Sequence, residues 1–399
     1  MTHASSFLVR LKPKSDPRPI RHGAPWVFAN EVVTDRRTKA IPPGAIARLQ
    51  DGEGQDLGTV AVNPLSKIFC RMLDRDPEAV IDQAWFARKL SAALAHRETL
   101  FDAPFYRLIH AEADGLPGVI IDRFGDALVI QPNAAWADVA FEALAAAAQD
   151  VTGCTTVVKN GTGRARTLEG LEEVTEVVSG AVDAPIPVPM NGATYIADLM
   201  GGQKTGLFYD QRPNHAFAQR LVAGKRVLDV FSHVGGFSLA ALAGGAESAM
   251  AVDSSAAALD LATQGAEAAG TAARFDTRRG DAFAVLEALA EEGAQFDVVI
   301  CDPPAFAPNR QALDKGLRAY ERVARLAAPL VVEGGYLGLC SCSHAADLAK
   351  FRTASTRGIG RAGRSSQLIH TGFAGADHPL MPQLAESGYL KALFYRLLP

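Results

Sequence analysis

The stretch that most constrains the fold of this chain is Arg226–Ala246, RVLDVFSHVGGFSLAALAGGA. It begins as an apolar run that reaches Asp229, turns through Gly235 and Gly236, and continues as an Ala- and Leu-rich segment typical of a helix. A strand, a glycine turn and a helix in this order bring the backbone close to a nucleotide-like ligand. Glycine pairs also end many ordinary strand-to-helix loops, so the stretch predicts where a ligand binds and leaves its identity open.

Beyond residue 190, apolar strands alternate regularly with helices. We predict strands at 226–231, 248–253, 273–278, 296–301, 335–341 and 390–397. This alternation is typical of an α/β fold with a doubly wound, mostly parallel, Rossmann-like sheet. Such sheets bind ligands at the carboxyl ends of their strands, so the functional side chains are expected there.

Two smaller regions precede this sheet. Residues 1–74 contain short strands separated by Gly, Pro and Asp turns, which predicts a small β-barrel. In residues 75–185 an initial helix is followed by a pattern of two strands, a helix and two strands, which predicts a small α/β domain. The proline-rich stretch Asp183–Pro189 is predicted to be a linker to the third domain, residues 190–399.

Composition limits the class of protein. With 48% hydrophobic and 21% charged residues, the 399-residue chain has the composition of a globular protein. No apolar run approaches about 18 residues, and the N-terminus lacks the apolar segment of a signal peptide, so we expect no membrane association. The five cysteines show no zinc-like pair of pairs, so we expect no metal site and free thiols in a reducing cytoplasm.

Basic residues are unevenly distributed although the formal net charge is −4. Residues 1–40 hold eight Lys or Arg against three acids, a local charge of +5, and residues 350–366 hold five basic residues and no acid. Such faces suit contact with a polyanion, although a solvated basic surface explains either patch alone. Arg21 and Trp26 lie in a segment that mixes basic and aromatic residues, which either clamps a nucleic acid or plugs the barrel.

Acidic residues stand at the ends of several predicted strands. Asp229 ends the first, and Asp253 ends the second, 24 residues later, where an acid can bind two ribose hydroxyls. Asp281 is placed to reach an adenine amino group, and Asp302 begins an Asp-Pro-Pro turn after the fourth strand. An isolated acid at a strand end is also a common helix N-cap.

A dinucleotide oxidoreductase is the first alternative for this pattern. Such an enzyme needs G-x-G-x-x-G directly after the first strand, whereas the segment here reads F-S-H-V-G-G-F. S-adenosylmethionine (SAM) has adenine and ribose but no pyrophosphate, so the pattern favours SAM.

Five motifs carry a resemblance to a known family. They are GGQKTGLFYDQRPNH (201–215), LDVFSHVGGFSL (228–239), Asp253, CDPPAF (301–306) and CSCSH (340–344). The C-terminal half resembles class I SAM-dependent methyltransferases, and the whole chain resembles the PUA-domain-containing 23S ribosomal RNA cytosine-C5 methyltransferases. The resemblance implies a PUA-like RNA-binding barrel, a small α/β domain and a methyltransferase domain, with SAM as cofactor, 23S ribosomal RNA as partner and a homodimer. Ser232 and His233 stand where many methyltransferases have glycine, which leaves the role of His233 open.

The residue pattern and the resemblance together give the candidate binding residues. Those for the cofactor are Asp229, Phe231, Gly235, Gly236, Asp253, Asp281, Asp302, Tyr209 and Gln211. Those for RNA are Lys204, Arg212, Pro303, Phe306, Arg21 and Trp26. Arg212 is placed to hold a phosphate or the cofactor carboxylate, and Phe306 to stack on the base.

The resemblance implies covalent catalysis by a cysteine. Carbon-5 of cytosine is a poor nucleophile, so it must first be activated. A thiolate adds to carbon-6, carbon-5 attacks the sulfonium methyl group, and a base removes the carbon-5 proton so that the cysteine can leave. Cys342 matches the family's S-C-S motif, and Asp302 is placed to bind N3 or the amino group of the base. Cys340 and Cys301 are expected to pack in the interior, and a buried structural thiol is the alternative for Cys342. His344 either deprotonates Cys342 or is a surface residue.

Two other functions stay open. An RNA methyltransferase that acts on a nitrogen needs no cysteine nucleophile, and Asp-Pro-Pro-type turns also serve amino-group methylation. A non-catalytic RNA-binding protein would keep a SAM-like pocket without methyl transfer. A small-molecule methyltransferase would leave residues 1–74 without a role.

Overall fold

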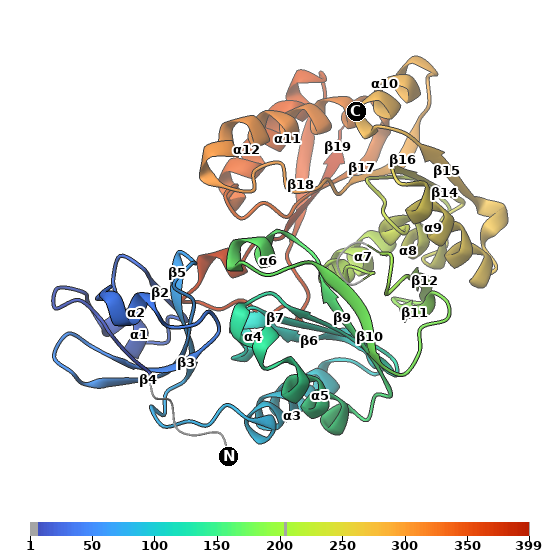
Figure 1. Ribbon diagram of the computed structural model, residues 1–399. Helices are drawn as coiled ribbons and strands as arrows, with labels where there is room; N and C mark the ends of the chain where they lie inside the picture. The colour runs from blue at the N-terminus through green and yellow to red at the C-terminus, as the bar shows by residue number, and fades with distance from the viewer. Residues whose placement is uncertain (1–6, 203–205, 399) are drawn as a thin grey trace. The chain divides into compact units, whose positions relative to one another are not determined.

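The computed structural model describes residues 7–202 and 206–398, which form two compact units (Figure 1). Unit 1 holds the described residues of 1–184, 199–206 and 377–385. Unit 2 holds those of 185–198, 207–376 and 386–399. The chain therefore passes between the units several times.

Unit 1 begins with a small five-stranded sheet in the order β1-β3-β4-β5-β2. Its strands are β1 (Phe7–Arg10), β2 (Trp26–Phe28), β3 (Ile46–Gln50), β4 (Asp56–Val62) and β5 (Ile68–Asp74), with short helices α1 (Arg18–Arg21) and α2 (Arg36–Lys39) between them. Alternate apolar side chains such as Val9, Leu49 and Val60 are fully buried in its core. The small β structure predicted ahead of the α/β regions is confirmed, and β2 is a strand that the sequence pattern did not predict.

The second sheet of unit 1 has the order β10-β9-β8-β7-β6. Its strands are β6 (Phe105–His110), β7 (Val119–Phe124), β8 (Ala127–Pro132), β9 (Thr156–Gly161) and β10 (Val174–Ser179). Its helices are α3 (Gln83–Leu100), α4 (Ala135–Val139), α5 (Phe141–Thr152) and α6 (Arg164–Glu169). The prediction of four strands was wrong, because the two-residue turn at Gly125 and Asp126 separates β7 from β8. Gly125 has a φ of 67°, which glycine adopts without strain.

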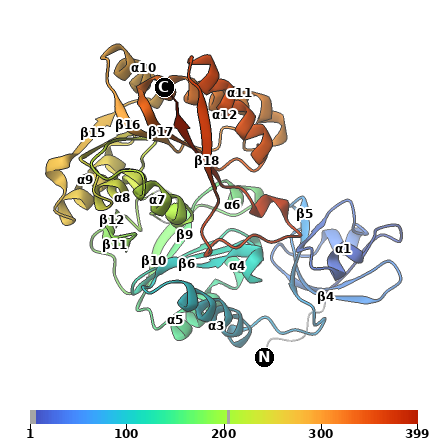
Figure 2. The same cartoon turned by 180° about the vertical axis from the view of Figure 1, so that it is seen from behind.

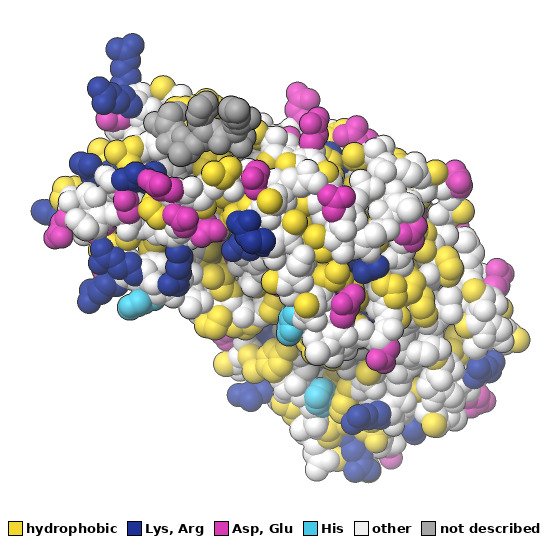
Figure 3. All heavy atoms as spheres, turned by 90° about the horizontal axis from the view of Figure 1, so that it is seen from below, with side chains coloured by type: hydrophobic (Ala, Val, Ile, Leu, Met, Phe, Trp, Pro, Cys, Tyr) yellow, Lys and Arg dark blue, Asp and Glu magenta, His cyan; other side chains and the backbone are white. Residues whose placement is uncertain are grey.

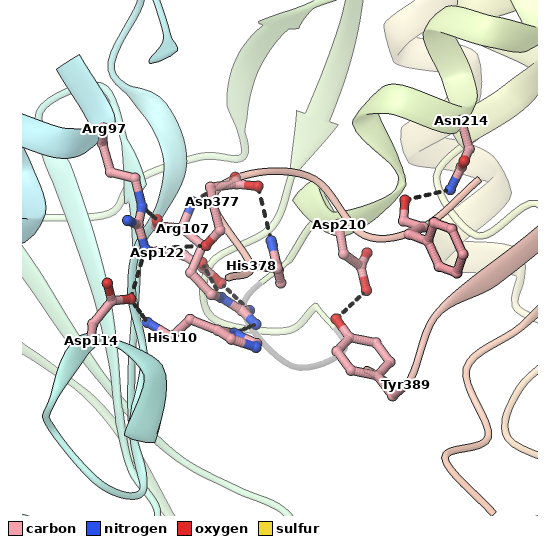
Figure 4. A network of polar contacts seen from close by, with 11 residues as sticks. Arg97, Arg107, His110, Asp114, Asp122, Asp210, Asn214, Asp377, His378 and Tyr389 are labelled. Atoms are coloured by element: carbon pink, nitrogen blue, oxygen red, sulfur yellow. Dashed lines mark hydrogen bonds and ion pairs between the residues drawn. The ribbon is translucent and has the colours of Figure 1, made fainter. Parts of the chain in front are cut away.

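The segment 377–385 contributes a buried polar network to unit 1 (Figure 4). The Asp377 carboxylate accepts a hydrogen bond from the Arg107 backbone N–H at 3.1 Å and pairs with His378 at 2.9 Å. The buried guanidinium of Arg97 donates to Asp114 at 2.7 Å and to the Asp377 carbonyl oxygen at 3.3 Å. These bonds fix a loop of unit 1 that lies in sequence between two strands of unit 2.

Unit 2 contains a seven-stranded sheet in the order β15-β14-β13-β16-β17-β19-β18. The strands are β13 (Arg226–Val230), β14 (Ser248–Asp253), β15 (Phe275–Arg279), β16 (Phe296–Cys301), β17 (Val331–Ser341), β18 (Ser366–Gly372) and β19 (Lys391–Leu397). Among these described strands, β19 runs antiparallel to both of its neighbours, β17 and β18, and the other neighbouring pairs are parallel. The predicted doubly wound α/β sheet is confirmed.

Helices cover both faces of this sheet (Figures 1 and 2). They are α7 (Arg212–Gln219), α8 (Gly236–Ala243), α9 (Ala256–Ala268), α10 (Ala282–Glu291), α11 (Leu313–Ala327) and α12 (Leu348–Arg361). Helices α7, α8 and α9 lie on one face, and α10, α11 and α12 lie on the other. Because both faces are covered, the central strands are mostly apolar, as Val227, Leu228 and Val230 in β13 show.

Two sequence predictions in unit 2 are corrected. Asp183–Pro189 is not a plain linker, because β11 (Ile186–Met190) pairs with β12 (Ala193–Ala197) in an antiparallel hairpin. Proline has no backbone N–H to donate. Pro187 and Pro189 are tolerated in this hairpin because each strand of a two-stranded sheet has one side without a neighbouring strand. Strand β18 was missed because it lies at the sheet edge and only one of its seven residues is buried.

No helix within residues 7–202 or 206–398 has the length and apolar character needed to cross a bilayer. The strand order places β13 between β14 and β16. The connection after β13 leads to β14 on one side, and the connection after β15 returns to β16 on the other side. The order of the strands therefore reverses between β13 and β16, and sheets of this kind bind ligands in the crevice outside the carboxyl ends of the strands at such a point.

Candidate active site

Asp229 holds the glycine turn from inside the sheet. It lies in β13 with no exposed surface, and its Oδ2 accepts hydrogen bonds from the backbone N–H groups of Phe237 at 3.1 Å and Ser238 at 2.8 Å. These donors belong to the first turn of α8, where helix N–H groups lack partners in the helix itself. Burial raises the pKa of Asp229 to about 7. Its Oδ1 has no hydrogen-bond partner among the described residues, although it is buried.

The turn after β13 has a strained backbone. Phe231 and His233 have φ angles of 62° and 49°, and Gly235 follows at 81°. Side chains other than glycine seldom adopt this left-handed region, and residues held there concentrate at functional sites. The ring of Phe231 lies 6.3 Å from those of both Phe283 and Phe306, so aromatic packing holds one strained residue.

Asp253 supports the same turn from the neighbouring strand. Its Oδ2 accepts a hydrogen bond from the His233 N–H at 2.9 Å, and its Oδ1 accepts one from the Ser255 N–H at 2.9 Å. The carboxylate is partly exposed at the end of β14, so its remaining lone pairs are open to a ligand. Asp281 instead caps α10 by accepting from the Ala284 N–H at 3.1 Å, and it is exposed.

Asp302 follows β16 and is bonded to the segment before α7. Gln211 Nε2 donates to Asp302 Oδ2 at 2.8 Å, and Gln211 Oε1 accepts from Asn214 Nδ2 at 2.6 Å. Asn214 Nδ2 also donates to the Phe373 carbonyl oxygen at 3.2 Å, and Tyr389 donates to Asp210 at 2.6 Å (Figure 4). This chain of bonds places the Asp-Gln-Arg part of the family motif against the Asp-Pro-Pro turn.

Cys342 lies directly after β17, the neighbour of β16 in the sheet. The structure describes all five cysteines; four are buried and Cys342 is partly exposed. Burial raises the thiol pKa of both Cys340 and Cys301 far above the usual range, as expected for packing residues. His344 is exposed.

Ser343 joins the loop of Cys342 to the loop of Asp302. Its Oγ accepts a hydrogen bond from the Ala307 N–H at 3.0 Å and lies 2.7 Å from the hydroxyl oxygen of Tyr320 in α11. All three partners are buried, so these bonds are protected from water. The loops after β16 and β17 are therefore fixed to each other and to α11.

Lys391, the first residue of β19, contacts the same loop. Its side chain is 3% exposed, and Nζ donates to the carbonyl oxygens of Ser343 at 2.7 Å and Ala346 at 2.8 Å. The sequence pattern did not predict a role for Ser343, Tyr320 or Lys391. The signal available was a serine next to the candidate cysteine and a lone lysine at the start of an apolar run.

The candidate RNA-binding residues lie in varied surroundings. The Arg212 guanidinium lies over the ring of Tyr209, a buried candidate for cofactor binding, at 5.4 Å from the centroid. Pro303 is buried. The Phe306 ring packs against that of Tyr320 at 5.0 Å, so it is part of an aromatic cluster, and it is partly exposed. Lys204 lies outside the described residues.

Arg21 and Trp26 have partners within unit 1. The Arg21 guanidinium pairs with Asp51 at 2.6 Å, and Trp26 Nε1 donates to Glu112 at 2.8 Å. On the face shown in Figure 3, Lys and Arg side chains are interspersed with Asp and Glu side chains. The basic charge counted along residues 1–40 is therefore partly balanced by nearby acids.

Comparison with known proteins identifies the family. A family model described as S-adenosylmethionine-dependent methyltransferase matches residues 157–396, and one described as PUA-like domain matches residues 9–75. Ribosomal RNA large subunit methyltransferase I of Cronobacter sakazakii is 36% identical over 372 residues, which cover 92% of this chain and 93% of that protein. The protein of the same name from Escherichia coli O157:H7 is 35% identical over 379 residues, covering 94% and 95%.

Solved structures have the same fold. A protein from Streptococcus mutans described as a SAM-dependent methyltransferase has a TM-score of 0.81 at 19% identity, covering 98% of this chain and 100% of that chain. The methyltransferase SMU.776, complexed with SAH, has a TM-score of 0.82 at 20% identity with the same coverage. At these identities the likeness shows the fold alone.

The fold and the site thus define a SAM-dependent methyltransferase with a PUA-like N-terminal domain. The chain belongs to the family of its relatives named ribosomal RNA large subunit methyltransferase I. The residues at the crevice fit this cofactor, because Asp253 offers an open carboxylate at the end of β14 and the buried Asp229 has an oxygen without a described partner. An unpaired buried carboxyl favours a cationic ligand nearby.

Proposed function

We propose that the chain methylates carbon-5 of a cytosine in large-subunit ribosomal RNA, with Cys342 as the nucleophile. The names of the relatives support the substrate class. The chemistry rests on one observation: the partly exposed thiol and Asp302 follow neighbouring strands, and the Ala307–Ser343 hydrogen bond joins their loops. A fixed distance between a nucleophile and a base-binding carboxyl group is what covalent catalysis on a pyrimidine requires.

Each residue has a separate role in the proposed reaction. SAM would supply the methyl group, and Asp229, Gly235 and Asp253, at the carboxyl ends of β13 and β14, would hold it. The Cys342 thiolate forms a bond to carbon-6, and the bond breaks again when carbon-5 has lost its proton to a base. Asp302, held by Gln211, binds N3 or the amino group of the cytosine.

We further propose that the three parts of the chain divide the work. Residues 1–74 bind RNA, with Arg21 and Trp26 in contact with it, and residues 75–185 form the small α/β domain. Residues 190–399 carry out methyl transfer in the cytoplasm, where a reactive thiol stays reduced. A target base in a paired region must be flipped out of its stack before it can reach Cys342.

The test combines methyl transfer with adduct formation. Wild type and labelled SAM are incubated with unmodified ribosomal RNA, and the modified base is mapped. We expect 5-methylcytosine in the wild type and no transfer by Cys342→Ala, whereas the matched control Cys154→Ala, at a buried cysteine of unit 1, retains transfer. RNA that contains 5-fluorocytosine should trap a covalent complex with the wild type only.

Two results would reject the proposal in different ways. Full activity of Cys342→Ala with a methylated ring or exocyclic nitrogen would establish a nitrogen methyltransferase. Absence of both SAM binding by calorimetry and methyl transfer in the wild type would leave a non-catalytic RNA-binding protein.

A further inference from the structure

We propose that Lys391 is a positioning residue for the reaction, and that its ammonium group stabilises the thiolate of Cys342. This inference rests on the proposed function, since it assigns the charge that the nucleophile needs. Lys391 lies 49 positions after Cys342 in the sequence, on a strand that is separated from the cysteine by α12 and β18.

The backbone geometry brings Lys391 to the cysteine loop. Strand β19 is antiparallel to β17, and Lys391 pairs with Ser341, the residue before Cys342. Nζ donates to the carbonyl oxygens of Ser343 and Ala346, which follow the cysteine in the same loop. The loop therefore bends around the ammonium group, with Cys342 between the paired residue and the first carbonyl acceptor.

The hydrogen bonds leave part of the ammonium group unused. An ammonium group has three N–H donors, and the two carbonyl oxygens account for two of them. Among the described residues, no carboxylate forms an ion pair with Lys391. A lysine that is 3% exposed is costly to keep charged with neutral acceptors alone, so an anionic partner is expected near Nζ.

The charged groups around Nζ favour this pairing. Burial lowers the pKa of Lys391 to about 8, and the Cys342 thiol and the Asp347 carboxylate at the start of α12 act in the opposite direction. From α11, the phenol of Tyr320 faces the same loop, and burial raises its pKa, so it stays neutral. Asp302, after β16, is another acid at this end of the sheet, and it is bonded to Gln211.

At neutral pH, Lys391 is therefore mostly protonated. The Asp347 carboxylate, at the exposed start of α12, is already paired with Lys350. A cation beside a thiol lowers the free energy of the thiolate. The proton that leaves Sγ goes to solvent, or to Nζ in the fraction of molecules in which the amine is neutral. Either path ends with the same ion pair of thiolate and ammonium.

The test measures the thiol directly, without RNA and without SAM. The alkylation rate of Cys342 by iodoacetamide is followed by mass spectrometry from about pH 6 to about pH 10 in the full-length protein. The other four cysteines are buried, and Cys342→Ser identifies the signal. We expect the rate of the wild type to reach half its maximum below the ordinary thiol pKa of about 8.5, and Lys391→Met to lower the rate near neutral pH about tenfold.

Lys391→Arg is the conservative control, because it keeps a cation with hydrogen-bond donors, and it should retain most of the wild-type rate. A purely structural role predicts that Lys391→Met, shown to be folded by circular dichroism, has the wild-type pH profile, and that result overturns the proposal. A wild-type midpoint above about pH 9 overturns it without any variant. A methyltransferase that works without Cys342 would refute the proposed function and leave this profile unchanged, so the two failures are distinguishable.

Discussion

The buried carboxyl group of Asp229 makes a quantitative prediction about stability. Burial raises its pKa from an ordinary 3.8 to about 7, so the folded protein holds this proton over a pH range in which the unfolded chain has lost it. A raised folded-state pKa contributes stability that is fully present below about pH 4 and is lost as the pH rises through about 7. Stability should therefore fall with rising pH over this window.

The magnitude follows from the two pKa values. The difference between 3.8 and about 7 corresponds to about 4 kcal/mol in total, of which about 2 kcal/mol is lost between about pH 5.5 and about pH 8. Asp229→Asn keeps the shape of the side chain and an oxygen for the N–H groups of Phe237 and Ser238, but it cannot ionise. The free energy of unfolding of the wild type minus that of the variant should therefore fall by about 2 kcal/mol over this range.

The assay is urea denaturation of both proteins at the two pH values in the same buffer system. Asp281→Asn, which removes an exposed carboxylate at the start of α10, measures the effect of losing one charge elsewhere in unit 2. A wild-type minus Asp229→Asn difference that stays constant within about 0.5 kcal/mol across the range would refute the reasoning, because the carboxyl group would then not be desolvated as the structure indicates.

Three further predictions concern single positions. Gly235→Ala should destabilise the protein by about 1–2 kcal/mol and weaken SAM binding in calorimetry, because φ is 81° and a Cβ would lie 3.0 Å from Leu239. The control is Gly245→Ala, where φ is 85° and a Cβ would meet open space. It should cost about 1 kcal/mol of stability and leave the SAM affinity unchanged. Ser343→Ala should lower the methyl-transfer rate about tenfold at unchanged SAM affinity, since the loops of the nucleophile and the base-binding acid lose their common hydrogen bond. Arg21→Gln should reduce the slope of log Kd against log salt concentration for RNA by about one, as measured by filter binding, and an unchanged slope would remove Arg21 from the interface.

Local patterns in the sequence were enough for the central strands of the seven-stranded sheet. Apolar runs followed by Asp or Gly predicted β13, β14 and β16 within a residue, because buried parallel strands need continuous apolar side chains. The same reasoning missed β2 and β18 and merged β7 with β8. Edge strands and two-residue turns carry weak patterns, because few of their side chains are selected by burial.

The candidate site shows a similar division. Three acids at or beyond a strand end have different surroundings in the structure. Asp229 is buried under α8, Asp253 is partly exposed, and Asp281 caps α10. Position along the strand does not reveal burial or the hydrogen bonds that an oxygen already makes. These depend on which helix packs over the strand end.

The sequence by itself determined the order of the elements, the glycine turn and the presence of one cysteine in the S-C-S motif, since each depends on a few consecutive residues. Only the tertiary structure decided that Ser343 joins the loops after β16 and β17 and that Lys391 of β19 lies against the loop of Cys342. Both contacts connect residues more than 30 positions apart. The antiparallel return of β19 beside β17 creates the second of them, and strand pairing over that distance is set by the packing of the whole sheet.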